Sequence, residues 1–277
     1  MSLPETERWL EGHAYLRPIG EFSARVERAL TEIGPPGVAL PEWDLYVEDL
    51  TAGVPLLSSA SAAVDLGPGT AAIGALVRKL EAGPLPEPVA AQVHALSADL
   101  RPADRLDRVV VWLLGDDTFA PAAPGLLRYL GWTTLARVLA PLVGAFGQWR
   151  DEERWMRRYC PTCGSAPAMA QLVGSEARLR RLSCGHCRTG WRYRRTQCPF
   201  CEADSQRSSA FTIEGEAGLR IDYCEACKGY LKTYAGTGNE DLLLADWTSL
   251  HLDLLAHDRG LNRAASSLYD VGSIVQV

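Results

Sequence analysis

The first 155 residues lack the patterns that usually mark a catalytic or cofactor site. They contain no cysteine, no glycine-rich phosphate-binding loop and no His-x-x-x-His pair, and their two histidines, His13 and His94, stand alone in the sequence. These absences argue against phosphate binding and histidine-ligated metal chemistry in this half of the chain. We expect His13 and His94 to be surface or structural residues.

Long apolar runs are also absent. The longest strongly apolar run, from Val109 to Leu114, is far shorter than the roughly 20 residues that a membrane-spanning helix needs. Arg137 and Pro141 interrupt the apolar stretch at 135–146. Residues 1–7 have neither the basic start nor the apolar core of a signal peptide. We therefore expect a cytoplasmic protein with no membrane partner.

Positive charge is not in excess over the whole chain. With 28 Lys and Arg against 34 Asp and Glu, the formal net charge is −6 and the isoelectric point is about 5.5. This balance argues against a nucleic-acid partner. The charge is uneven, however, because eleven arginines lie between Arg150 and Arg195. They either balance metal-bound thiolates or form a docking surface for a protein or RNA.

Within this basic region, Trp191 and Tyr193 alternate with Arg192 and Arg194. On a strand, alternate residues face opposite sides, so the aromatic and basic groups would be separated. A base-stacking surface needs both on one face, so the pattern disfavours RNA. We hypothesise that the strand at 191–195 contributes to docking of a protein.

All eight cysteines are present as four Cys-x-x-Cys pairs, which begin at Cys160, Cys184, Cys198 and Cys224. Twenty residues separate the first pair from the second, and twenty-two separate the third from the fourth. Two cysteines at this spacing can turn both sulfurs toward one point and leave two tetrahedral corners for another pair. The spacing therefore predicts two four-thiolate metal sites in series.

The local sequence around the cysteines fits tight metal-binding turns. Pro161 and Pro199 restrict φ just after the first cysteine of a pair, and Gly164 and Gly229 are expected where a left-handed backbone is needed. Structural disulfides would require an oxidising compartment. A thioredoxin-like dithiol would require a βαβ setting rather than short strands. Four thiolates suit either zinc or a rubredoxin-type iron.

Apolar periodicity predicts an irregular helical bundle in the first half, whereas the second half predicts short strands. Helices are expected near 22–33, 41–46, 71–80, 88–100 and 104–114, with one or two more in 124–149, where Pro141 should kink or divide the segment. Strands are expected at 168–173, 178–183, 189–195, 208–213, 219–223 and 229–234, and a closing helix at 248–256.

The second half repeats its plan with an offset of 38 residues, each unit being a cysteine turn, a hairpin, a second cysteine turn and a strand. Such a unit is too small to build a core alone, so a metal would supply much of its folding free energy. We predict an α+β protein with a helical domain at 1–155, a first module at 156–196, and a second module with a C-terminal helix at 197–277.

Three segments resemble the formate dehydrogenase accessory protein family, FdhE. They are Arg158 to Gly164, Trp191 to Cys201 and Cys224 to Thr233, and the segment from Leu250 to Gly260 is similar to that family's closing helix. The resemblance is specific over roughly 159–260 and only general in the helical half, where the Gly53 to Leu57 segment is similar in character.

The resemblance implies a non-enzymatic, cytoplasmic maturation factor. Such a protein has two tandem rubredoxin-like modules, binds the catalytic subunit of respiratory formate dehydrogenase and is required for that enzyme's activity. It implies two metal ions, iron of the rubredoxin type or zinc, with one bound by Cys160, Cys163, Cys184 and Cys187 and the other by Cys198, Cys201, Cys224 and Cys227.

Two other functions compete with this one. A zinc-ribbon module that binds nucleic acid or docks a protein would use the metals only for shape, and its nucleic-acid binding would depend steeply on salt. A dithiol enzyme would instead be metal-free, with a reactive cysteine of low pKa. The sequence leaves open the native metal, any redox role and self-association.

Overall fold

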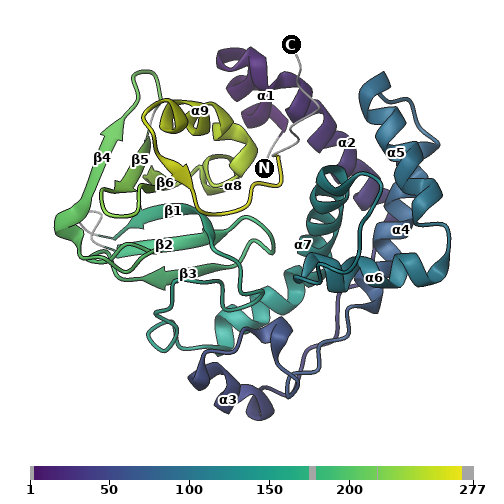
Figure 1. Ribbon diagram of the computed structural model, residues 1–277, viewed down its shortest axis with the longest axis horizontal. Helices are drawn as coiled ribbons and strands as arrows, with labels where there is room; N and C mark the ends of the chain where they lie inside the picture. Colours follow the sequence, from purple (N-terminus) through teal and green to yellow (C-terminus); the bar gives the residue numbers. More distant parts are fainter. Residues whose placement is uncertain (1–2, 175–178, 217, 270–277) are drawn as a thin grey trace.

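The computed structural model describes residues 3–174, 179–216 and 218–269. A helical bundle stands beside one β-sheet, and C-terminal helices cover a face of that sheet (Figure 1). The predicted α+β class is confirmed, with helices before residue 155 and two four-cysteine units after it.

The helices of the bundle lie at the predicted segments, but the helix predicted at 22–33 begins five residues earlier and the one predicted at 41–46 ends six residues later. Helix α1 and two short 3-10 turns are added to them. The elements are α1 (Leu3–Gly12), η1 (Ala14–Leu16), α2 (Arg17–Ile33), α3 (Trp43–Ala52), η2 (Leu56–Ser58), α4 (Gly67–Glu81), α5 (Glu87–Asp99), α6 (Ala103–Leu113) and α7 (Pro124–Trp149). Prolines in the first turn of α2, α4, α5 and α7 explain several of the starts, because proline's fixed φ suits that position.

Helix α7 is the centre of the bundle and packs against α4, α5 and α6. Pro141 does not divide it, so the stretch 124–149 forms one helix rather than two. Proline has no N–H to donate to the Arg137 carbonyl four residues earlier. The neighbouring Val138 carbonyl also accepts a hydrogen bond from the Val38 N–H at 3.3 Å, which ties the segment before α3 to this turn. By length and composition α7 could cross a membrane, but 61% of its most apolar window is buried inside the protein, as in a core helix.

The strands form one sheet in the order β3-β2-β1-β6-β5-β4, with β7 beside β6. For the first six strands, both the first and the last residue lie within two residues of the predicted bounds. They are β1 (Pro167–Val173), β2 (Leu179–Cys184), β3 (Gly190–Tyr193), β4 (Ser208–Thr212), β5 (Leu219–Cys224) and β6 (Gly229–Ala235), and β7 (Asn262–Arg263) is added. Of the segment between β1 and β2 only Gly174 is described, so Arg178, the predicted start of the second strand, lies outside the described residues.

The two cysteine units share this sheet through one parallel pairing. Within each unit the strands are antiparallel, but β1 of the first unit pairs in parallel with β6 of the second, from Met169 opposite Lys232 to Leu172 opposite Ala235. The first unit also packs into the bundle, because Trp191, Tyr193 and Leu182 belong to the same buried cluster as the apolar residues of α7. The bundle and the first unit therefore have one continuous core.

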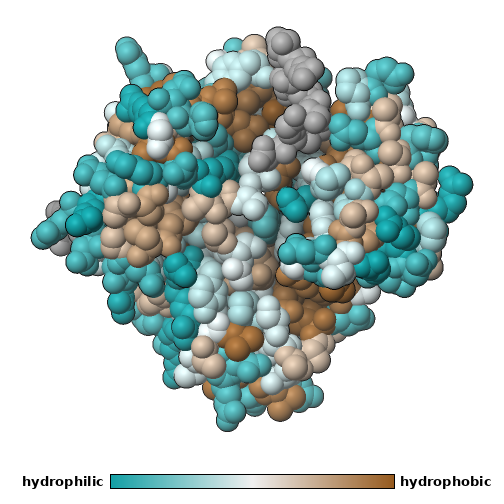
Figure 2. All heavy atoms as spheres, viewed as in Figure 1, coloured by the Kyte–Doolittle hydropathy of each residue, from teal (hydrophilic) through white to brown (hydrophobic). Residues whose placement is uncertain are grey.

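The C-terminal segment covers the second unit. It contains α8 (Glu240–Leu243), η5 (Asp246–Ser249) and α9 (Leu250–Asp258), which agrees with the predicted closing helix. Leu252 and Ala256 of α9 pack against Leu219, Ile221 and Tyr234 of the sheet. Figure 2 shows a largely hydrophilic outer edge on the face in view, with the most apolar surface near α1 and near the lower part of the bundle.

Candidate metal centres

The four Cys-x-x-Cys pairs come together as two four-sulfur clusters. Each cluster combines the turn that precedes a unit's first strand with a later hairpin turn, which is β2–β3 in the first unit and β5–β6 in the second. Within each cluster all sulfur atoms lie within 4.8 Å of one another. The first site contains Cys160, Cys163, Cys184 and Cys187, and the second contains Cys198, Cys201, Cys224 and Cys227.

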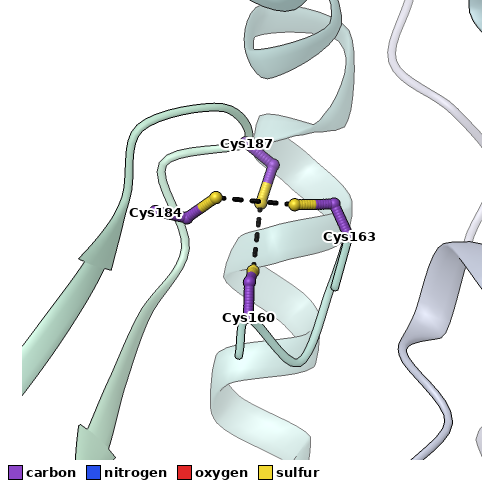
Figure 3. Close-up of side chains that lie close together, drawn as sticks. All are labelled: Cys160, Cys163, Cys184 and Cys187. Carbon is purple, nitrogen blue, oxygen red and sulfur yellow. Dashed lines mark hydrogen bonds between the residues drawn. The ribbon is translucent and has the colours of Figure 1, made fainter. Parts of the chain in front are cut away.

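The sulfur positions suit a tetrahedral ion. A tetrahedron with metal–sulfur distances of about 2.3 Å has edges of about 3.8 Å. In the second site the Sγ–Sγ distances are 3.8 Å for Cys198–Cys227 and 3.7 Å for Cys201–Cys224. In the first site the Cys160–Cys187 and Cys163–Cys184 distances are both 3.4 Å, and Figure 3 shows these four sulfurs pointing toward a common centre. Each cluster could hold one metal ion.

Hydrogen bonds with the other sulfurs lower the pKa of Cys163 well below its ordinary value, but burial opposes the ionisation of other thiols in both clusters. Burial is the main cause that raises the pKa of Cys198 to about 12 and the pKa of Cys160 well above its ordinary value. A bound cation would reverse this effect, because the thiolate is the form that ligates metal. Backbone N–H groups also point at the sulfurs, with His186 donating to Cys184 Sγ and Phe200 to Cys198 Sγ, both at 3.4 Å. The donor set therefore fits a thiolate-bound metal.

Each cysteine pair is followed directly by a residue in the left-handed region. These residues are Gly164 (φ 78°), Arg188 (φ 61°), Glu202 (φ 62°) and Lys228 (φ 58°). The expectation for Gly164 is confirmed, but the one for Gly229 is wrong, since Lys228 has the left-handed backbone. Gly229 is required for space, because a Cβ there would lie 2.8 Å from the Phe200 ring and 3.2 Å from Cys227 Sγ.

The first site is buried against the helical bundle. The N–H groups of Leu56 and Leu57 donate to the carbonyls of Pro161 and Thr162 at 2.9 and 2.8 Å, which ties the first cysteine turn to η2. On the other side of the site, the His186 ring stacks on Trp132 of α7 at 4.6 Å between ring centroids. The segment at 53–57, where the family resemblance was only general, therefore supports the metal site.

The second site lies nearer to solvent. Cys201 is exposed and Cys227 is half-buried, whereas Cys198 and Cys224 are buried. A pocket of about 230 Å³ opens beside it, and its lining includes Arg180, Arg220, Asp222 and Phe200. The two sites therefore have the same type of ligand, but the cysteines of the second site are more exposed to solvent.

The arginines of the first unit are largely paired within the protein. Arg181 binds Glu152 at 2.7 Å, and Arg192 pairs with Glu153. The acidic residues at 151–153 follow α7 in a turn, and Glu152 and Glu153 reach the sheet through these two ion pairs. Trp191 and Tyr193 are buried, which confirms the predicted alternation in β3 and removes them from the surface.

Sequence patterns did not reveal a buried charge network between β6 and the C-terminal segment. Lys232, only 1% exposed, binds Asp246 at 2.7 Å and Asp253 at 2.8 Å, and Arg263 binds the same two carboxylates at 2.8 and 2.7 Å. Tyr230 also donates to Asp253 at 2.6 Å. The one local signal was a lysine in a strand whose other residues are mostly apolar or aromatic.

We expect a chelator such as EDTA to remove metal from the second site roughly tenfold faster than from the first, a ratio that corresponds to about 1.4 kcal/mol in the barrier. The reason is the exposure of Cys201, compared with the complete burial of Cys160. Release would be followed with a metal indicator, and Cys201→Ser and Cys163→Ser would assign the two phases. Equal rates, or earlier loss from the first site, would contradict this expectation.

Comparison with known proteins identifies the family. A family model described as the FdhE central domain matches residues 159–195. An FdhE homologue from Pseudomonas aeruginosa is 32% identical over 286 residues, which cover 95% of this chain and 86% of that protein. The chain belongs to the FdhE family. The resemblance inferred from the cysteine segments is thereby confirmed.

Other FdhE proteins match less than half of this chain in sequence. A homologue from Aquifex aeolicus is 34% identical over 117 residues, or 40% of this chain and 41% of that protein. FdhE of Escherichia coli K12 is 28% identical over 138 residues, or 48% and 45%. The crystal structure of the FdhE protein from P. aeruginosa has a TM-score of 0.65 at 24% identity over 95% of this chain and 92% of that one. The FdhE fold therefore extends over the helical half as well.

Proposed function

We propose that this FdhE-family protein is a maturation factor, not an enzyme, that binds the catalytic subunit of respiratory formate dehydrogenase in the cytoplasm and is required for that enzyme's activity. The observation that supports it most is the pair of four-cysteine clusters in a chain of this family. A metal with four protein ligands has no open position for a substrate or water. Such a centre supports shape or electron transfer rather than hydrolysis.

We also propose that each cluster binds one metal, iron of the rubredoxin type or zinc. Cys160, Cys163, Cys184 and Cys187 would hold one ion, and Cys198, Cys201, Cys224 and Cys227 the other. Metal content per chain and an absorption spectrum of protein purified without oxygen would test this. Two ions including iron would support a redox role, two zinc ions would indicate a structural one, and metal-free protein with freely titrating thiols would refute the ligand assignment.

The division into 1–155, 156–196 and 197–277 is likewise a proposal. A shared core and the parallel β1–β6 pairing link the three parts, so we propose that they act as one scaffold. The alternative of a nucleic-acid-binding zinc ribbon is less favoured, because Trp191 and Tyr193 are buried and cannot stack on bases.

For docking, we propose the surface formed by Arg192 at the end of β3 and the exposed Arg194 that follows it. Replacing both with glutamate should abolish copurification with the catalytic subunit, because the surface changes by four charge units. The measurement is affinity copurification from cells that express both proteins, with metal content measured in parallel.

Because Arg192 also pairs with Glu153, its replacement removes an internal ion pair. Glu153→Ala removes the same pair without reversing the surface charge and should leave copurification intact. Arg101→Glu, at an exposed position of the helical half, controls for charge reversal elsewhere. Unchanged copurification of the double variant would refute the docking surface, and loss in Glu153→Ala would show that the ion pair matters instead.

A further inference from the structure

Two histidines and a glutamate from three distant segments meet at one point. His13 lies between α1 and η1, Glu216 lies in the turn that connects β4 to β5, and His251 lies in the first turn of α9. His13 Nε2 is 2.9 Å from Glu216 Oε1, and His251 Nε2 is 2.5 Å from the same oxygen. One atom from each residue lies within 4.8 Å of the others.

The hydrogen bonds fix the orientation of His13. Its Nδ1 lies 2.9 Å from the Trp9 carbonyl, which can only accept, so Nδ1 carries a proton and donates it. In the neutral ring Nε2 then carries a lone pair that is directed toward the glutamate. A histidine that binds a metal through one ring nitrogen usually donates the N–H of its other ring nitrogen to a carboxylate, a backbone carbonyl or water, as His13 does here. Trp9 also stacks on the His13 ring at 3.9 Å between ring centroids, which holds the ring in place.

Two polar atoms of the cluster have no partner among the described residues. They are Glu216 Oε2 and His251 Nδ1, both fully buried. The Glu216 side chain is only 7% exposed and each histidine 14%. A buried carboxylate facing two imidazoles needs positive charge nearby, either on the rings or between the three groups. Burial is the main cause that lowers the pKa of His251, which favours the neutral ring that binds metals.

The geometry points to a third metal site, in which His13, Glu216 and His251 bind a divalent first-row transition metal through two imidazole nitrogens and one carboxylate. This donor set suits zinc, iron(II) and cobalt, and it leaves a fourth position for water. It contains no sulfur, so it is chemically distinct from the two cysteine clusters. It is also separate from them in sequence, since none of its ligands lies in a Cys-x-x-Cys turn.

Occupation requires a small adjustment of one side chain. In a tetrahedral site with bonds of about 2.0–2.1 Å, neighbouring ligand atoms are about 3.3 Å apart. The two Nε2–Oε1 distances are shorter than this, so the Glu216 carboxylate must withdraw or turn its free Oε2 toward the ion. The unpartnered Oε2 makes that turn possible without breaking another hydrogen bond.

A metal here would fasten three parts of the chain together. The cluster joins the N-terminal helix α1 to the tip of the second unit's hairpin and to α9 (Figure 1). Tyr15 closes the group, with its ring edge-on to both histidines at 5.9 and 5.7 Å between centroids. The ion would therefore hold α1 to the second metal module.

The test uses the full chain with both cysteine clusters filled with zinc and weakly held metal removed. Titration with Co²⁺ should show one further equivalent whose visible spectrum has weak ligand-field bands and no sulfur-to-cobalt charge transfer. His251→Gln and Glu216→Gln should weaken this binding by at least roughly 100-fold. The two zinc ions and the circular dichroism spectrum should be unchanged in both variants.

His94→Gln is the matched control, because His94 is 77% exposed and, within the part of the chain that the structure describes, its glutamate partner Glu81 belongs to no such cluster. This variant should bind the third equivalent as the wild type does. Saturating Zn²⁺ should raise the melting temperature of the wild type and of His94→Gln but not of His251→Gln. No uptake at millimolar free Co²⁺, or equal uptake by His251→Gln, would overturn the proposal.

Discussion

Replacing Cys160 with serine is expected to remove one metal equivalent per chain and to destabilise the protein by several kcal/mol. Structural zinc sites contribute binding free energies of about 10–16 kcal/mol to small domains, which is comparable to the whole stability of a folded protein. Cys160 is fully buried in the core that the bundle and the first unit share. Loss of its thiolate should loosen the β2–β3 turn and its contact with α7.

The measurements are metal content and tryptophan fluorescence, since Trp132 stacks on His186 beside the first site. Cys201→Ser is the control: it should also remove one equivalent, but with a smaller loss of stability and little change in fluorescence, because Cys201 is exposed. Full metal content in Cys160→Ser, or equal destabilisation by the two variants, would show that the first site does not support the bundle.

Replacing Lys232 with methionine is expected to lower the free energy of unfolding by about 3–5 kcal/mol, the usual cost of leaving a buried charge without its partner. Asp246 and Asp253 would then share Arg263 as their remaining cation in this network. Urea unfolding at pH 7 measures the effect. Lys79→Met is the matched control, because its pair with Glu32 is exposed and should contribute less than about 1 kcal/mol.

The pH dependence of this network provides a second measurement. Burial opposes ionisation of Asp246, but Lys232 and Arg263 prevail and hold the pKa of its carboxyl well below the usual range. A carboxyl with a depressed pKa contributes stability above its unfolded pKa of about 3.9 and loses it as the pH falls. The wild type should therefore lose more stability than Lys232→Met between pH 6 and pH 3. Parallel pH curves would contradict this explanation.

Helices α2 to α7, the closing helix α9, six of the strands and both cysteine clusters could be predicted from the sequence because their signals are local, whereas α1 and α8 were not predicted. Apolar spacing and prolines placed the helices, and the interval between pairs showed which cysteines meet. The left-handed position after Cys227 was misplaced because glycine is the usual residue there, whereas Lys228 adopts it here. Pro141 was expected to kink or divide the segment at 124–149, and the structure has one undivided helix there.

The remaining features depend on contacts between distant segments. No local pattern indicates that β1 pairs with β6, or that Lys232 meets Asp246 and Asp253. His13 was predicted to be an isolated surface or structural residue, yet it meets Glu216, 203 residues away. Two histidines and one glutamate so far apart carry no recognisable spacing, and only the packing of α1 and α9 brings them together.

The parallel pairing of β1 with β6 also determines the order in which the protein can be completed on the ribosome. All parts of the first cluster emerge before any part of β6, because the bundle, the turn at 160–163 and the β2–β3 hairpin precede it in the chain. The first cluster can therefore assemble while β6, the parallel partner of β1, is still missing. Until Ala235 has emerged, one side of β1 has no partner strand, and such an edge is prone to pair with other chains. Metal bound by the first cluster would fix the β2–β3 turn during that interval, but the edge of β1 that faces β6 would be covered only when β6 pairs with it.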